Sequence, residues 1–264
     1  MLKNREIEQM AVALSIAGSD SGAGAGIQVD LLTFAAHGVY GTTAITCLTA
    51  QNPHGVTDIH VAPATFVIEQ CEQVVKHYHP QAIKTGMLFN SEIVIAVAEF
   101  LTRNSIPYVV DPVMVASSGA TLLSPEAIAA VKNYLIPRAT LVTPNLDEAS
   151  ILLGRKAHGG EQNESEAREL AQRFGVPFLL KGGHALGNEL MDTLAWPNGK
   201  IMSLKAMRIP DIDTHGSGCT LSAAITAQLA LGNDLAKAIT MAHRYLQDGM
   251  KNPIRVAGLK HIRH

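Results

Sequence analysis

Thr214-His215-Gly216-Ser217-Gly218-Cys219-Thr220 is followed at once by an alanine-rich apolar run, Leu221 to Leu231, which stops at Gly232. This order predicts a glycine-rich turn that opens a buried helix. The first N–H groups of a helix have no partner within it, and its amino end carries partial positive charge, so the turn suits a phosphate. Cys219 lies at the amino end of this expected helix, where a thiol tends to have a lowered pKa. A flexible linker before a core helix would have the same composition, so this stretch alone leaves both interpretations open.

The chain has 264 residues, 47% of them hydrophobic, and a formal net charge of −2. This length favours one large α/β domain over residues 1–264, with residues 1–10 as a polar extension. The charge provides no basic footprint for nucleic acid, and no apolar run reaches the ~18 residues of a membrane helix. Cys47, Cys71 and Cys219 form no closely spaced pair, and Met1–Met10 has no apolar core of a signal peptide. We therefore expect a cytoplasmic protein that binds neither nucleic acid nor membrane.

Short apolar runs alternate with segments of helical spacing. The expected strands cover 11–17, 40–50, 82–85, 108–110, 141–143 and 178–180, and a hairpin joins 191–196 to 200–207. The expected helices cover 27–36, 63–77, 91–103 with Ser91 as its N-cap, a segment starting at Ser124-Pro125, 164–174, and two at the end. This alternation predicts a three-layer α/β/α fold with a mostly parallel central sheet.

A glycine-rich loop, Gly18 to Gly26, follows the first expected strand. A dinucleotide-binding fingerprint would need glycine or alanine where Ile27 or Val29 stands, so an NAD-dependent oxidoreductase is disfavoured. The loop is expected either to wrap a small substrate or to turn the chain.

Polar groups and Met87 follow the expected strands at their carboxyl ends, where ligands bind in parallel α/β sheets. These are Asp20, Gln51, Met87, Asp111, Asn145 and Lys181. Asn145-x-x-Glu148 fits either a helix capping box or, with Asp111, oxygen ligands for magnesium. Lys181 either meets a nucleotide phosphate or extends from a strand end into solvent.

Taken together, the motifs resemble a known family. The matching stretches are Ile16–Asp20, Gly24–Asp30, Leu48–Asn52, Lys84–Leu88, Asp111–Val115, Thr143–Ala149, Lys181–His184 and Thr214–Thr220. With these stretches in this order, the chain is similar to the hydroxymethylpyrimidine and phosphomethylpyrimidine kinases of thiamine biosynthesis, which belong to the ribokinase-like superfamily. The resemblance covers about residues 13 to 250, and the last ~14 residues do not match the family's common ending.

The resemblance implies an ATP- and Mg²⁺-dependent kinase that phosphorylates the hydroxymethyl group of an aminopyrimidine and then its monophosphate. It implies the following roles: Asp30, Gln51, Met87 and Val113 around the pyrimidine; Asp111 and Glu148 at magnesium; Asn145, Lys181 and Thr214 on the nucleotide side; and Gly216, Gly218 and Cys219 as anion hole and catalytic base. It also implies a homodimer.

Two alternatives within the fold stay open: a pyridoxal kinase and a non-catalytic ligand-binding regulator. Pyridoxal-phosphorylating relatives commonly carry methionine where Gln51 stands and often cysteine where Ala116 stands, so both positions favour the pyrimidine. Ser117 departs from the family, which commonly has lysine there.

Overall fold

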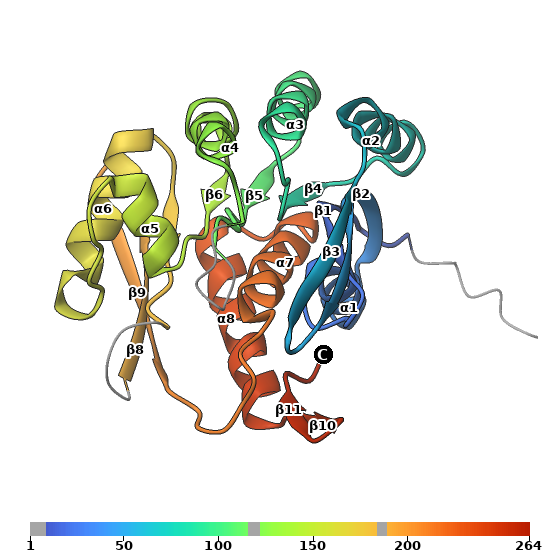
Figure 1. The fold of residues 1–264 in the computed structure, drawn as a ribbon. Helices are drawn as coiled ribbons and strands as arrows, with labels where there is room; N and C mark the ends of the chain where they lie inside the picture. The colour runs from blue at the N-terminus through green and yellow to red at the C-terminus, as the bar shows by residue number, and fades with distance from the viewer. Residues whose placement is uncertain (1–8, 116–121, 184–188) are drawn as a thin grey trace, which may run out of the picture.

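The computed structural model describes residues 9–115, 122–183 and 189–264 (Figure 1). The positions of Ala116, Ser117 and His184 lie outside these residues, as does most of the amino-terminal extension.

Within the described residues, nine strands form one sheet in the order β3-β2-β1-β4-β5-β6-β7-β8-β9. Neighbouring strands from β2 through β7 pair in parallel, whereas β3, β8 and β9 are antiparallel to their neighbours. The strands are β1 (Val12–Asp20), β2 (Tyr40–Asn52), β3 (Gly55–Val61), β4 (Ala82–Thr85), β5 (Tyr108–Val110), β6 (Leu141–Val142), β7 (Phe178–Leu180), β8 (Glu189–Ala195) and β9 (Ile201–Met207). A separate carboxyl-terminal hairpin joins β10 (Ile254–Val256) to β11 (Leu259–His261).

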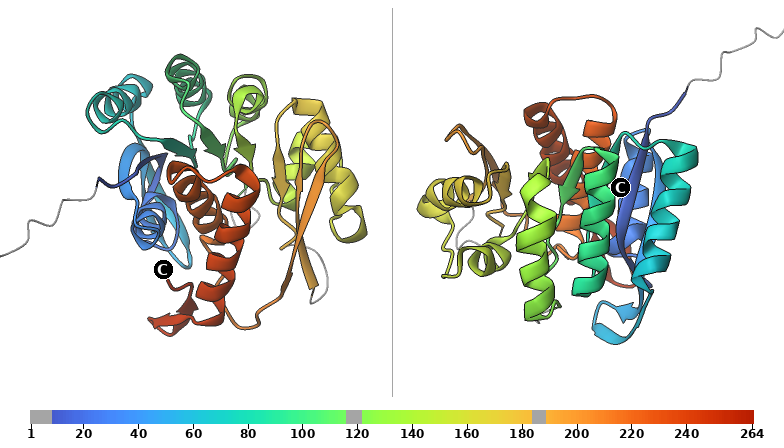
Figure 2. Two further views of the ribbon diagram at one scale, coloured as in Figure 1. Left: turned by 180° about the vertical axis from the view of Figure 1, so that it is seen from behind. Right: turned by 90° about the horizontal axis from the view of Figure 1, so that it is seen from above.

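Helices cover both faces of the sheet, so the predicted three-layer α/β/α architecture is confirmed. Helices α2 (Ala64–Tyr78), α3 (Ser91–Asn104) and α4 (Pro125–Ala130) lie on one face, and α1 (Gly26–Ala36), α7 (Ser217–Ala230) and α8 (Leu235–Lys251) lie on the other (Figures 1 and 2). Helices α5 (Leu146–Leu153) and α6 (Asn163–Phe174) pack in the same core as α3 and α4. A π-helical turn (Val131–Leu135) and 3-10 turns (Ile136–Arg138, Gly160–Gln162) complete the helical segments.

The central strands are apolar without alternation because helices bury them on both sides. In β5, Tyr108 and Val110 pack in the core of α3 and α4, whereas Val109 packs in the core of α7 and α8. No helix among the described residues has the length and apolar character needed to cross a membrane.

Three local expectations were wrong or incomplete. The strand expected over 40–50 continues to Asn52, and the chain then folds back as β3, which was not predicted because its residues are mostly exposed and show no buried face in the sequence. The N-cap of α3 is Asn90, whose side chain accepts a hydrogen bond from the N–H of Ile93 (2.9 Å), so Ser91 is already helical. The carboxyl-terminal hairpin was not predicted either.

Candidate functional site

The site lies where the glycine loop that follows β1 touches the amino end of α7. Gly216 is the N-cap of α7 with φ of +79°, and a β-carbon added there would lie 1.9 Å from the carbonyl oxygen of Gly24. No other residue could take this backbone conformation without displacing the loop. The helix begins at Ser217 rather than at the apolar run, so the glycine-rich turn is itself the first turn of α7. Thr214 is exposed, and its carbonyl accepts from the N–H of Ser217 (3.0 Å).

Asp20 organises the glycine loop, a function that the sequence did not reveal. Its carboxylate accepts hydrogen bonds from the N–H groups of Gly22 (2.8 Å), Gly24 (3.2 Å) and Ala25 (2.9 Å). It also lies 3.2 Å from Nε2 of His215. Burial opposes its ionisation, but the hydrogen bonds from His215 and the loop outweigh burial and lower the pKa of Asp20. The hydrogen bond to Asp20 raises the pKa of His215.

A second polar cluster surrounds Lys181. Its Nζ lies 3.4 Å from Oδ1 of Asp111, whose other oxygen accepts from the hydroxyl of Ser222 (3.2 Å). A β-carbon at Gly218 would lie 3.0 Å from this Nζ, so Lys181 reaches the first turn of α7 instead of extending into solvent. Burial acts to lower the pKa of Lys181, but Asp111 and Glu148 outweigh it and raise the pKa.

Glu148 and Asn145 form the capping box of α5. Asn145 accepts from the N–H of Glu148, and Glu148 accepts from the N–H of Asn145, both at 2.9 Å. The second carboxylate oxygen of Glu148 accepts from the N–H of Met114 (3.2 Å). Burial raises the pKa of Glu148 to about 6, with Lys181 opposing and Asp111 adding to the shift.

The carboxylates of Asp111 and Glu148 are suitable ligands for magnesium, but they would fill only part of its coordination shell. No group of three or more His, Cys, Asp or Glu side chains that could hold a metal ion occurs in the described part of the chain. A cation at Asp111 and Glu148 would therefore take its remaining ligands from nucleotide oxygens and water, as Mg²⁺ commonly does.

The pKa of Cys219 differs from that expected for a thiol at the amino end of a helix. Burial raises its pKa to about 11, with Lys84 opposing and Asp111 and Asp30 adding to the shift. A lowered pKa was therefore the wrong expectation for this arrangement, because burial and two nearby carboxylates outweigh Lys84 and the hydrogen bond from the N–H of Gly26.

Asp30 lies beneath the site, with no exposed surface. Its oxygens are 2.7 and 2.8 Å from Nζ of Lys84, and one accepts from the hydroxyl of Ser15 (2.6 Å). The structure thus does not bring Asp30 to a surface that a ring could contact. The sequence signal for Lys84 was a charged residue directly after Ala82 and Ile83 in a short buried strand, since buried charges need partners.

Two of the residues expected around the ring, Met87 and Gln51, contact the glycine loop, and a third, Val113, follows the end of β5. A β-carbon at Gly18 would lie 2.9 Å from the terminal methyl group of Met87. Nε2 of Gln51, as placed, lies 3.3 Å from Nε2 of His215. Val113 has φ of +42°, a strained conformation for a β-branched residue and one that clusters at functional sites.

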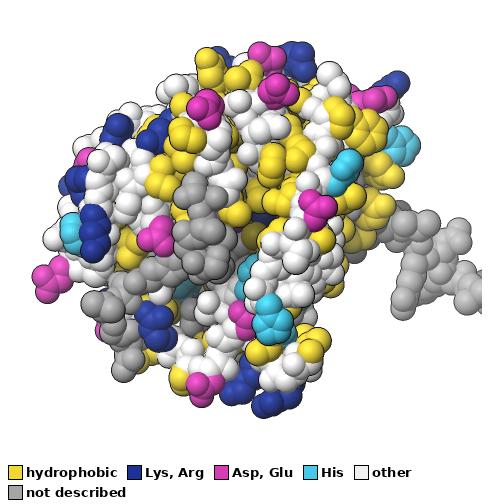
Figure 3. All heavy atoms as spheres, in the orientation of Figure 1, with side chains coloured by type: hydrophobic (Ala, Val, Ile, Leu, Met, Phe, Trp, Pro, Cys, Tyr) yellow, Lys and Arg dark blue, Asp and Glu magenta, His cyan; other side chains and the backbone are white. Residues whose placement is uncertain are grey.

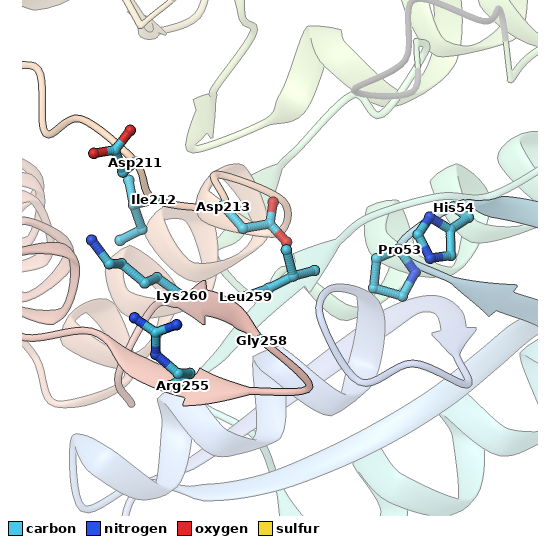
Figure 4. Close-up of a pocket in the computed structure, with 9 residues that line it drawn as sticks. All are labelled: Pro53, His54, Asp211, Ile212, Asp213, Arg255, Gly258, Leu259 and Lys260. Atoms are coloured by element: carbon cyan, nitrogen blue, oxygen red, sulfur yellow. The ribbon is translucent and has the colours of Figure 1, made fainter.

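The surface over these elements is hollowed near the centre of the face in Figure 3, with Lys or Arg side chains visible inside the hollow. A cavity of about 610 Å³ lies between Pro53 and His54 after β2, the 211–213 segment and the β10–β11 hairpin (Figure 4). Asp211, Asp213, Arg255 and Lys260 give its walls mixed charge, and none of the expected site residues lines it.

Comparison with known proteins identifies the family. A family model described as phosphomethylpyrimidine kinase matches residues 20–262. The chain belongs to this family. The match extends past residue 250, where the resemblance was expected to end, and includes the hairpin of β10 and β11.

Individual relatives agree with this assignment. The chain is 47% identical over 237 residues to the hydroxymethylpyrimidine/phosphomethylpyrimidine kinase of Rhizobium meliloti, covering 89% of each chain. Among solved structures, it is similar to a phosphomethylpyrimidine kinase from Clostridium difficile, with a TM-score of 0.79, 38% identity, and coverage of 90% of this chain and 98% of that one. It is also similar to the pyridoxal kinase of Bacillus subtilis in an ADP complex, with a TM-score of 0.89, 32% identity, and coverage of 97% and 98%. The predicted family and the ribokinase-like fold are therefore confirmed.

Proposed function

We propose that this chain is a bifunctional kinase of thiamine biosynthesis that acts as a single domain. It transfers phosphate from ATP to the hydroxymethyl group of 4-amino-5-hydroxymethyl-2-methylpyrimidine, and then to the monophosphate to form the diphosphate. The observation that carries this proposal is the family match over residues 20–262, with relatives that are named for both steps.

The first turn of α7, with its N-cap Gly216, would stabilise the charge of the transferred phosphoryl group. The N–H groups of Gly216, Gly218 and Cys219 would bind the oxygens of the transferred phosphoryl group. Lys181, which is paired with Asp111, reaches the same turn. Asn145 and Thr214 would lie on the nucleotide side. Mg²⁺, held by Asp111 and Glu148, would neutralise phosphate charge when bound.

Cys219 is the proposed base for the hydroxymethyl proton. With a pKa of about 11 its thiolate is a minor species at neutral pH. This is compatible with phosphoryl transfer, because in a loose transition state the attacking alcohol loses its proton late. Only the thiolate form can accept the alcohol proton, so the reacting enzyme is the fraction whose thiol proton has already passed to solvent.

Gln51 favours the pyrimidine over pyridoxal. A carboxamide has both an N–H donor and an oxygen acceptor, which match the ring nitrogen and amino group of an aminopyrimidine. Pyridoxal has no such edge. Pyridoxal kinase is retained as the second candidate because the Bacillus subtilis structure is so similar in fold.

We propose further that the protein is a cytoplasmic homodimer. The edge strand β3 and its surroundings expose Val56 (45%), Leu48 (50%) and Phe66 (54%). An unpaired edge strand beside exposed apolar side chains is a surface that another chain can cover. Sedimentation analysis of the wild type and Val56→Lys would test it; a monomeric wild type would contradict it.

A coupled ADP-release assay tests the function with hydroxymethylpyrimidine, its monophosphate and pyridoxal as acceptors. We expect turnover of both pyrimidines and less with pyridoxal. Cys219→Ala should still bind ATP and lose roughly 10²–10⁴ in turnover, the usual span for a lost general base. Pyridoxal as the best acceptor would support the second candidate instead, and wild-type turnover in Cys219→Ala would contradict the proposed base.

A further inference from the structure

His215 belongs to the segment Thr214–Thr220, the proposed anion turn, and its side chain contacts Asp20, Gln51 and the glycine loop. Its Nε2 lies 3.2 Å from Oδ2 of Asp20 and 3.3 Å from the carboxamide of Gln51. The imidazole packs against the glycine loop, since a β-carbon at Gly24 would lie 2.7 Å from its Cδ2. Its backbone N–H donates to Oδ1 of Asp213 (2.9 Å), which fixes the residue from the other side.

The carboxylate of Asp20 decides which ring nitrogen carries the proton. An ionised carboxylate only accepts hydrogen bonds, and this one already accepts from three N–H groups of the glycine loop. The imidazole nitrogen that faces it must therefore be a donor. His215 is thus protonated at Nε2, whatever the state of Nδ1.

This proton in turn decides the orientation of the Gln51 carboxamide. The oxygen and nitrogen of an amide are assigned from their hydrogen bonds, because their positions alone do not distinguish them. The single N–H at Nε2 of His215 already donates to Asp20, so the Gln51 amide lies beside it as the second partner of a three-centre hydrogen bond. The amide oxygen can take that place as an acceptor, whereas the amide NH₂ group would set two donors against each other. The stable arrangement turns the oxygen of Gln51 toward the imidazole and leaves its NH₂ group directed elsewhere.

We propose that His215 is a specificity-determining positioning residue, which fixes the carboxamide of Gln51 in the orientation that accepts a 4-aminopyrimidine and rejects a 4-oxopyrimidine. The amide NH₂ then faces a ring nitrogen that accepts, and the second lone pair of the amide oxygen faces the amino group. A 4-oxo ring carries the opposite pattern, N–H beside C=O, and binding it requires the amide to turn away from His215. This inference rests on the proposed function of the site.

The test compares kcat/KM for hydroxymethylpyrimidine and for its 4-oxo analogue. His215→Phe keeps a flat ring and removes the donor, so the preference for the amino compound should fall about 2- to 12-fold, the value of one hydrogen bond. His215→Gln, whose NH₂ can reach the position of Nε2, should restore part of the preference. In a Gln51→Ala background, His215→Phe should leave the preference unchanged.

A second measurement does not depend on activity or on a variant. Long-range ¹H–¹⁵N spectra of the wild-type chain report which nitrogen of His215 is protonated, and we expect Nε2–H. A neutral ring protonated at Nδ1 alone would overturn the inference, even if the variants failed to fold.

The outcomes separate this inference from the proposed function. If the wild-type enzyme phosphorylates the aminopyrimidine and His215→Phe keeps the full preference for the amino over the 4-oxo compound, the inference is wrong and the proposed function stands. The same holds if His215→Phe changes the preference equally with and without Gln51. Wild-type enzyme that phosphorylates pyridoxal and neither pyrimidine overturns both.

Discussion

Replacing Lys84 by methionine should lower the free energy of unfolding, because it removes one partner of a buried ion pair. Nζ of Lys84 lies 2.7 and 2.8 Å from the two oxygens of Asp30, and both side chains have no exposed surface. Lys84→Met leaves Asp30 buried and paired only with the hydroxyl of Ser15. Breaking a buried pair on one side costs about 3–5 kcal/mol, a large part of the ~5–15 kcal/mol that stabilises a typical domain.

The chain offers a matched control at the same distance. Lys205 and Glu189 also lie 2.7 Å apart, but their side chains are 69% and 60% exposed. Lys205→Met should leave the midpoint of urea unfolding almost unchanged, because water solvates the remaining carboxylate. The comparison thus varies burial while the ion-pair distance stays constant.

A double variant separates the buried charge from the loss of packing. Asp30→Leu with Lys84→Met removes both charges, and apolar pairs in such positions are often as stable as the ion pair. We expect the double variant to be more stable than Lys84→Met, with a remaining loss of about 1–3 kcal/mol from the unpartnered hydroxyl of Ser15. Equal losses in the single and double variants, or equal effects of Lys84→Met and Lys205→Met, would refute the reasoning.

The remaining predictions concern the site itself. Because its pKa is raised to about 11, Cys219 should react with iodoacetamide at a rate that keeps rising well above pH 9, measured by mass spectrometry with Cys71 (pKa about 12) as a buried reference; a plateau near pH 8 would contradict the raised value. Glu148→Gln should raise the magnesium concentration needed for half-maximal rate, whereas an unchanged titration and rate would leave the capping box as the sole function of Glu148. Gln51→Met should lower kcat/KM for hydroxymethylpyrimidine by roughly 5–150-fold, the cost of an unpaired buried group, and affect pyridoxal less; a variant that keeps its pyrimidine rate would remove Gln51 from recognition.

The central sheet could be predicted from the sequence because burial on both faces leaves an apolar run with a sharp end. Strands β4 and β5 were predicted with their observed limits for this reason. Strand β3 could not be found, since its side chains are mostly exposed and give no alternation of burial. The N-cap of a helix was predicted correctly where only one residue suits that position, as at Ser124. It was predicted wrongly where two neighbouring residues, Asn90 and Ser91, both suit it.

The candidate site was predicted as a set of strand ends, but its contacts across the sheet were not. Nothing local in the sequence shows that Lys84 pairs with Asp30 or that Ser222 donates to Asp111, because each pair joins residues that are distant in the chain. The raised pKa of Cys219 has the same origin, since it depends on burial and on the carboxylates of Asp30 and Asp111, which are distant in the chain.

The segments proposed to bind the ring and the transferred phosphate are in direct contact. Gly216 packs against the carbonyl of Gly24, so the anion turn cannot move without moving the loop that Asp20 holds. The segment entering the turn is tied in addition to the carboxyl-terminal hairpin, since the N–H of Asp213 donates to the carbonyl of Lys260 (2.9 Å). Asp213 also holds the backbone of His215, which reaches Gln51. A substitution in the hairpin that displaces Asp213 is therefore expected to alter selectivity for the ring as well as turnover, although the hairpin itself carries none of the groups proposed to contact the substrate.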